Sequence, residues 1–149
     1  TNEIDGTNCP QYADKGWYIE LDSNAPSKSG RKKVTAEPTI GNGVIYFPIY
    51  KPNTDNICGI GDSFVCAADG ECGYNMSKGL GTNPSEKQTE KCFYVGSGAL
   101  SKIVVFDGDL YANIAGETKV GNKSSKDLLI LDALAGSVKS LRLNWRENF

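Results

Sequence analysis

The sequence predicts an all-β chain of short antiparallel strands with almost no helix. Short apolar or alternating segments recur along the 149 residues, separated by glycine, asparagine, aspartate and proline, which is typical of strands and turns. No long stretch repeats its apolar residues with the period of about 3.6 that a helix requires. The pattern of residues 34–46 also recurs in residues 100–111, with Gly43 aligned to Gly108.

The repeat extends past its first strands. Tyr46 aligns with Tyr111 at the same offset, and in each copy a short apolar strand then runs into an Asp-x-x-x-Gly segment, at residues 69–73 and 132–136. Such repeats predict blades of a β-propeller or a related solenoid, in which each unit buries its faces against its neighbours. Propellers close with about 4–8 blades, commonly of four strands each. Two copies therefore predict part of a larger ring.

The repeat divides the chain into three parts. Residues 1–30 are expected to finish a preceding blade, because residues 17–21 read as a half-buried strand bounded by a glycine and a polar loop. Residues 31–92 hold the first copy of the blade. Residues 93–149 hold the second copy and the C-terminus.

Each copy has its own expected elements. In the first copy we expect a hairpin turn over 41–43, a strand over 44–50 that bends or bulges at Pro48, a strand over 64–68 and a turn over 69–73. In the second copy we expect strands over 93–95, 103–106, 110–114, 128–131 and 138–145. Residues 77–90 carry hardly any apolar residue, so they are expected to form an exposed loop.

Charge and hydropathy exclude two classes of partner. The net charge is −2, and the basic residues are scattered apart from a run at 31–33, so nucleic acid is not expected to bind. No apolar run approaches the roughly 20 residues that span a bilayer. Residues 1–8 have no signal-peptide character, so we expect an exported chain that is already processed or cut.

The five cysteines indicate an oxidising compartment. Four of them cluster and are candidates for two disulfides, for which three pairings are possible: Cys58, Cys66, Cys72 and Cys92. Cys9 stands apart, and is expected to be free or bonded to a cysteine before Thr1. A zinc site is the competing interpretation, but the chain has no histidine and no close Cys-x-x-Cys pair.

The sequence predicts no catalytic, cofactor-binding or metal-binding residue. Without histidine, a Ser-His-Asp triad, a Cys-His dyad or a histidine-ligated haem cannot be built from this chain. Asp107 and Asp109 are the nearest carboxylate pair, but they occupy the expected hairpin turn of the second copy. Asp69 and Asp132 recur at one position of the repeat, which a repeated turn explains.

Two short loops offer oxygen ligands for calcium, at residues 5–8 and 53–56. Neither has the carboxylate spacing or the terminal glutamate of a calcium-binding loop, so solvated turns are favoured. The Gly-x-Gly segments at 59–61 and 79–81 open no helix, as a phosphate-binding loop must. They are interpreted as loop glycines.

Five motifs, taken in their order along the chain, resemble the C-terminal propeller of type IV pilus tip-associated proteins, the PilY/PilC family. They are Gly16-Trp-Tyr-Ile-Glu-Leu21, Lys33-Val-Thr-Ala-Glu-Pro38, Gly43-Val-Ile-Tyr-Phe47, Cys58-Gly-Ile-Gly61 and Asn144-Trp-Arg-Glu147. The blade pattern by itself is shared with quinoprotein-like propellers. The resemblance implies the last two or so blades of such a propeller.

The same resemblance implies a function and a location. It implies a large exported protein of the cell surface, pilus tip, outer membrane or periplasm, with an adhesive N-terminal region and a propeller that supports pilus assembly and attachment. The implied partners are the remainder of the propeller or another exported chain, and pilus proteins. Calcium is possible in the parent protein, but no segment here matches the family's aspartate-rich loop. The loops at 53–61 and 77–90 are the expected contact sites.

Three functions are consistent with this pattern. The first is a non-enzymatic structural and interaction module of a pilus-tip adhesin or assembly factor. The second is a fragment of a quinoprotein-like dehydrogenase, which would need cofactor-stacking aromatics and calcium ligands. The third is a periplasmic scaffold for outer-membrane assembly. Fold alone does not separate them, and the motif order favours the first.

Overall fold

The computed structural model is an all-β structure with almost no helix, as the sequence predicts. It describes residues 2–3, 17–21, 30–56, 58–81, 92–120 and 123–135. Its strands are β1 (Asn2–Glu3), β2 (Trp17–Tyr18), β3 (Lys33–Val34), β4 (Thr39–Gly41), β5 (Val44–Lys51), β6 (Asp62–Asp69), β7 (Phe93–Ser97), β8 (Val104–Phe106), β9 (Asp109–Asn113), β10 (Glu117–Thr118) and β11 (Leu128–Asp132). One 3₁₀ turn, η1 (Ser77–Leu80), follows β6 in the described part of the chain.

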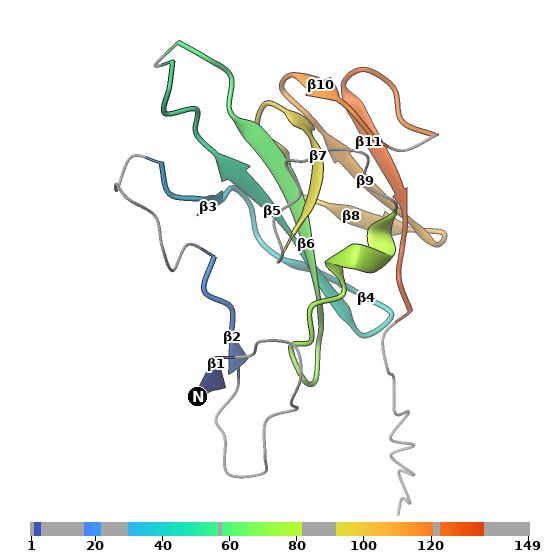
Figure 1. Ribbon diagram of the computed structural model, residues 1–149. Helices are drawn as coiled ribbons and strands as arrows, with labels where there is room; N and C mark the ends of the chain where they lie inside the picture. Colours follow the sequence, from blue (N-terminus) through green and yellow to red (C-terminus); the bar gives the residue numbers. More distant parts are fainter. Residues whose placement is uncertain are drawn as a thin grey trace, which may run out of the picture.

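The strands form two main sheets (Figure 1). The larger sheet has the order β10-β7-β6-β5-β3, and β4 also pairs with β5 farther along that strand. The smaller sheet has the order β11-β9-β8. Every pairing in both sheets is antiparallel, whereas β1 and β2 form a separate two-residue parallel pair. Within the described residues, neither sheet closes on itself.

The two repeats predicted from the sequence fold into matching hairpins. Residues Asn42 and Gly43 join β4 to β5, and Asp107 and Gly108 join β8 to β9. Their φ angles are 51° and 77° in the first turn and 47° and 81° in the second. Positive φ at both central residues is the mark of a type I′ turn, which Asn-Gly and Asp-Gly favour because its twist matches that of the strands.

In both copies the third strand pairs with the second strand in the same register. In the first copy, which we define as β4, β5 and β6, Tyr46 lies opposite Ala67. In the second copy, defined as β8, β9 and β11, Tyr111 lies opposite Ile130. The repeat is therefore a duplicated three-stranded meander.

The main core lies between the two sheets. Its buried members from the larger sheet and η1 are Val44, Tyr46, Val65, Ala67, Leu80, Phe93 and Val95. Those from the smaller sheet and the residues next to its strands are Leu100, Ile103, Leu110, Ala112, Ile114, Leu129 and Leu131. Two threonine hydroxyls in and before β4 also bind the segment that precedes β8, because Thr35 donates to the carbonyl of Leu100 and Thr39 to that of Ile103.

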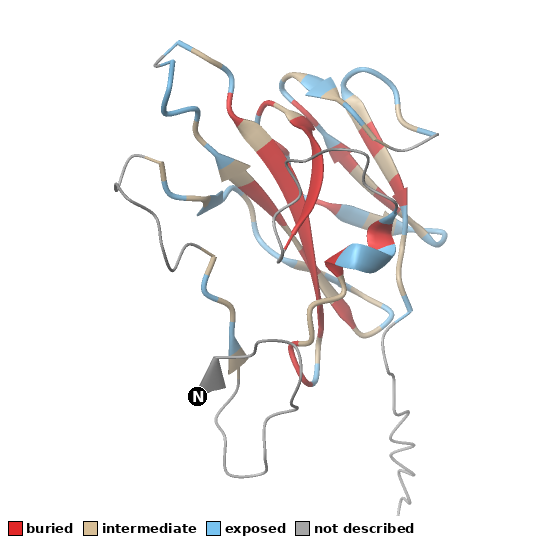
Figure 2. Cartoon of the chain, viewed as in Figure 1, coloured by how far each residue is buried: buried red, intermediate tan, exposed pale blue. Residues whose placement is uncertain are grey.

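Strand β6 is the centre of the larger sheet and is buried on both faces (Figure 2). Its second face belongs to another apolar cluster, whose buried members are Ile49, Phe64, Cys66, Cys92 and Tyr94. The rings of Phe64 and Tyr94 meet edge to face, with centroids 5.6 Å apart. A strand covered on both sides reads as a continuous apolar run, which explains the segment Phe64-Val-Cys-Ala-Ala68.

The predicted turn after β6 is confirmed. The side chain of Asp69 accepts hydrogen bonds from the backbone N–H groups of Glu71 and Cys72, at 3.0 and 2.8 Å. An aspartate that bonds the backbone two or three residues ahead is a common turn-former. Asp69 is therefore a turn residue, as predicted from the sequence.

The expected bulge at Pro48 is wrong for the pairing of β5 with β6, whose register is unbroken from Val44 to Lys51. Pro48 lies where the other partner of β5 changes from β4 to β3, and its carbonyl accepts from Thr35 N–H. Proline has no backbone N–H, and at Pro48 the missing group would point to the side of β5 where pairing with β4 has ended and pairing with β3 has not begun. The register shift of this sheet lies instead in β6 against β7, between Ser63 and Phe64.

Two further expectations are corrected in the second half of the chain. The start of the predicted exposed loop at 77–90 is η1, in which Ser77 and Leu80 are buried. Strand β10 was not predicted, and it leaves the second copy to pair with β7 in the larger sheet. The remaining predicted loop residues and the strand expected over 138–145 lie outside the described residues.

Candidate interaction surface

The outer face of the smaller sheet carries Val104 and Phe106, two of the six large apolar residues that are exposed in the described part of the chain. Side chains alternate along β9 and β11, so Leu110, Ala112, Leu129 and Leu131 enter the core. The others point away from the core. We call this surface the Tyr111 face, formed by Val104, Phe106, Asp109, Tyr111, Asn113, Leu128, Ile130 and Asp132.

An apolar row crosses the Tyr111 face. Val104, Tyr111 and Ile130 lie side by side on the three strands, close enough to contact one another. Val104 is 53% exposed, and Phe106, two residues along the same strand, is 69% exposed. Exposed apolar side chains that are contiguous mark interaction sites more often than scattered ones.

One end of the Tyr111 face is charged. The ammonium group of Lys123 lies 3.0 and 3.2 Å from the two carboxylate oxygens of Asp109 and 3.0 Å from Asp132. The hydrogen bond that Asp132 accepts from Lys123 holds the pKa of Asp132 below its ordinary value, and the bonds that Lys123 donates to Asp109 and Asp132 hold the pKa of Lys123 above its own. Two carboxylates and one ammonium leave this end of the face with a net charge of −1, whereas the apolar row beside it is uncharged.

The matching face of the first copy is buried. By register, Tyr111 and Ile130 correspond to Tyr46 and Ala67. Tyr46 is 0% and Ala67 1% exposed, and both lie in the core against the smaller sheet. The two copies therefore stack head to tail, with the tyrosine face of the first against the opposite face of the second. A two-fold arrangement would instead bury both tyrosines or neither.

A hydroxyl anchors this stacking. Tyr46 accepts a hydrogen bond from the N–H of Leu134 at 2.7 Å and donates one to its carbonyl at 3.3 Å. Leu134 follows β11, so the hydroxyl binds the backbone just beyond the third strand of the next copy. Burial raises the pKa of Tyr46, partly offset by the bond with Leu134. The hydroxyl of Tyr111 donates only a long bond, at 3.5 Å, to Asp109.

The loop between β5 and β6 is also exposed, as predicted. The side chain of Asn53 accepts bonds from the N–H groups of Asp55 and Asn56, and the side chain of Asn56 accepts one from Cys58. These oxygens therefore shape the loop, and within the described residues no cluster of three or more potential metal ligands occurs. Ile60 is 62% exposed here. The other calcium candidate, residues 5–8, lies outside the described residues.

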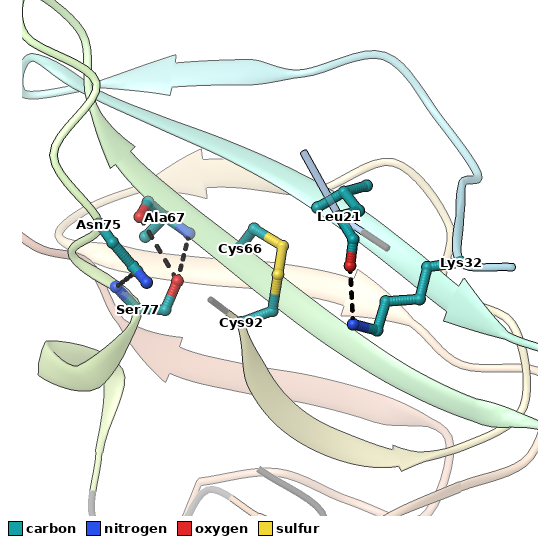
Figure 3. Close-up of a disulfide and its surroundings, with 7 residues drawn as sticks. All are labelled: Leu21, Lys32, Cys66, Ala67, Asn75, Ser77 and Cys92. Carbon is teal, nitrogen blue, oxygen red and sulfur yellow. Dashed lines mark hydrogen bonds between the residues drawn. A yellow bond between two sulfur atoms is a disulfide. The ribbon is translucent and has the colours of Figure 1, made fainter. Parts of the chain in front are cut away.

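The cysteines differ in state. Cys66, on β6, forms a disulfide with Cys92, directly before β7, and their Cα atoms are 4.3 Å apart. Figure 3 shows this bond between the Ser77–Ala67 contact and the bond from Lys32 to the Leu21 carbonyl. Cys72 is also disulfide-bonded, and Cys58 is an exposed free thiol. Cys9 lies outside the described residues.

Sequence reasoning missed a pair of serines. The hydroxyl of Ser77 bonds both the N–H and the carbonyl of Ala67, and the hydroxyl of Ser124 bonds both groups of Ile130. Ala67 and Ile130 are matching positions in the two third strands. Ser124 thus occupies backbone groups on the open edge of β11, and Ser77 occupies those of β6 beyond its pairing with β7. Ser77 follows its strand and Ser124 precedes its own, so alignment of the repeats does not reveal them.

Comparison of the chain with protein-family models, curated proteins and solved structures finds no match. No helix in the described part of the chain has the length and apolar character needed to cross a membrane. The buried Cys66–Cys92 disulfide is typical of proteins that fold outside the cytosol.

Proposed function

We propose that this chain is a non-enzymatic structural and interaction module of a type IV pilus tip-associated adhesin or assembly factor. The observation that carries the proposal is the head-to-tail stacking of two matching meanders, which leaves the Tyr111 face exposed. Stacking in one direction can continue into a ring or an open array. It therefore supports blades at the end of a quinoprotein-like β-propeller, as the motif order implies.

A scaffold of this type suits a role in assembly at the cell surface. Two sheets and a disulfide hold the described loops on a packed core, and such loops can vary without disturbing the fold. The Cys66–Cys92 bond supports export to an oxidising compartment. Pilus proteins and further sheets of the same propeller are the proposed partners.

Removal of the module in the source cells tests this function. Deleting residues 31–135 from the parent gene should abolish surface pili and attachment, measured by electron microscopy of sheared pili and by a surface-binding assay. Complementation with the intact gene, at protein levels matched by immunoblot, should restore both. Normal pili and attachment in the deletion strain would remove the proposed function.

A further inference from the structure

We infer that Lys123, Ser124 and Ser125 form an edge guard, which keeps β11 of this chain from pairing with β11 of a second copy. The inference goes beyond the proposed function, because it concerns the backbone edge of β11 and not the side chains of the Tyr111 face. It therefore does not depend on whether this chain belongs to a pilus-tip protein.

Strand β11 is the longest strand at an open edge of either main sheet in the described part of the chain (Figure 1). It has five residues, whereas β3 and β10 have two and β4 and β8 have three. Residues 128–131 are four consecutive aliphatic residues. A long apolar strand at a sheet edge offers its N–H and C=O groups to another chain, so proteins shorten, charge or cover such edges.

The outward backbone groups of β11 are complementary to those of a second copy. Alternate residues of an antiparallel edge strand direct both their N–H and their C=O outward. Both groups of Ile130 bind Ser124 and so point away from the sheet, and by alternation Leu128 and Asp132 do the same. In a two-fold pair centred on Ile130, the two isoleucines would exchange both bonds and Leu128 would lie opposite Asp132. An uncovered β11 could therefore pair with itself.

The edge guard occupies these outward groups. The Ser124 hydroxyl accepts a hydrogen bond from the Ile130 N–H at 2.8 Å and donates one to the Ile130 carbonyl at 3.1 Å. The Ser125 N–H donates to the Leu128 carbonyl at 2.9 Å. A second strand would have to displace these bonds before it could pair at Leu128 or Ile130.

Both ends of the edge guard are tied to the fold. At one end, the Lys123 ammonium lies 3.0 Å from the Asp132 carboxylate, and a lysine at a strand edge also opposes the approach of another strand. Just past the other end, the Lys126 carbonyl accepts a hydrogen bond from the Thr118 N–H at 2.9 Å. Thr118 belongs to β10 of the larger sheet. The edge guard is therefore held from both sheets.

The first copy shows that a strand fits at this place. By register, Val65 of β6 corresponds to Leu128 of β11. Val65 pairs with Phe93 of β7, which is the next strand of the larger sheet. The second copy has the edge guard where the first copy has this strand. The outer edge of the third strand can thus accept a strand, and in the second copy the edge guard excludes one.

Two double variants provide a matched test. Lys123→Ala/Ser124→Ala removes the ammonium and the hydroxyl of the edge guard. Ser125→Ala/Lys126→Ala makes the same two replacements beside it and keeps the bonds of the Ser125 N–H and the Lys126 carbonyl, which are backbone bonds. All four side chains are exposed or half-buried. Sedimentation velocity of the purified full-length protein at rising concentration measures self-association, and hydrogen exchange follows the Ile130 amide.

In dilute solution, Lys123→Ala/Ser124→Ala should speed exchange of the Ile130 amide about fivefold, since one hydrogen bond is lost. At high concentration this variant should form dimers and regain the lost protection. The unchanged protein and Ser125→Ala/Lys126→Ala should not associate in this way. A serine with a structural role alone would lose protection without regaining it at high concentration.

A third change locates the contact. Adding Ile130→Pro to Lys123→Ala/Ser124→Ala should abolish the dimer, because proline has no N–H for a ladder and is tolerated where that N–H points away from the sheet. A Lys123→Ala/Ser124→Ala protein that stays monomeric would overturn the inference. So would equal dimerisation of Ser125→Ala/Lys126→Ala, or dimers that persist with Ile130→Pro.

Discussion

The two copies of the meander share a backbone plan but differ in what covers them. Both have a type I′ turn, one strand register and a serine hydroxyl on the edge of the third strand. Tyr46 is nevertheless fully buried, whereas Tyr111 remains partly exposed and its neighbour Phe106 is 69% exposed. Position in the stack therefore distinguishes the buried tyrosine from the partly exposed one.

This difference makes the first copy a reference for the second. The stabilising free energy from covering the Tyr46 face estimates the free energy that covering the Tyr111 face would contribute to binding a partner. Exposed apolar surface costs stability in isolation and contributes to binding when it is covered. Substitutions at matching positions can therefore separate folding from docking.

The largest difference is expected between the two tyrosines. Tyr46→Ala removes a buried ring and both bonds to Leu134, so it should lower the free energy of unfolding by about 3–5 kcal/mol. Tyr111→Ala removes a partly exposed ring and should cost about 1 kcal/mol or less. Urea denaturation of the two variants measures the comparison. Equal losses would contradict the assignment of the two faces.

The disulfide is the next largest difference between the copies. Cys66 of the first copy corresponds to Leu129 of the second, so one third strand is cross-linked and the other is packed only by side chains. Replacing Cys66 and Cys92 by alanine should cost about 2–4 kcal/mol. Cys58→Ala, at an exposed thiol, is the control and should change stability by no more than about 0.5 kcal/mol.

Hydrogen exchange would locate the effect of the disulfide. Loss of the Cys66–Cys92 bond should increase amide exchange in β6 and β7 more than in β9 and β11, because local openings follow local contacts. A uniform increase across both sheets would show that the two copies unfold only together.

Replacing the serine of the first copy should cost more stability than replacing the serine of the second copy. Ser77 is 1% exposed, so Ser77→Ala leaves the Ala67 N–H unsatisfied inside the protein and should cost about 1–3 kcal/mol. Ser124 is only partly buried, and water can replace its hydroxyl beside Ile130. Ser124→Ala should therefore cost less than Ser77→Ala. Thermal or urea unfolding measures both, and the reverse order would contradict the burial assigned to these edges.

The smallest effect concerns pH and is confined to the second copy. Lys123 lowers the pKa of Asp132 in the folded chain. The ionised pair therefore stabilises the fold above the ordinary aspartate pKa of about 3.9, and this contribution is lost as pH falls through the lowered value. NMR titration of the Asp132 carboxyl should show the shift, and Lys123→Ala should abolish it. An unchanged titration in that variant would contradict the assigned cause.

Local signals predicted much of the strand plan. Asn-Gly and Asp-Gly mark both hairpins, and the shared register follows from the aligned repeats. Burial could not be predicted in the same way, because Tyr46 and Tyr111 occupy matching sequence positions and only the stacking distinguishes them. Leu80 was missed because it is an isolated apolar residue in a polar stretch. Strand β10 was missed because its two residues take their partner from the other sheet.

The most direct test is native mass spectrometry of this protein isolated from source cells, with the Phe106→Asp variant compared with the unchanged protein. The head-to-tail account predicts that the unchanged protein travels with a partner and that Phe106→Asp releases it. Phe106→Asp should release it because docking would bury an unpaired carboxylate against an apolar sheet. A partner retained by Phe106→Asp, or an unchanged protein that is a lone folded monomer, would contradict the account.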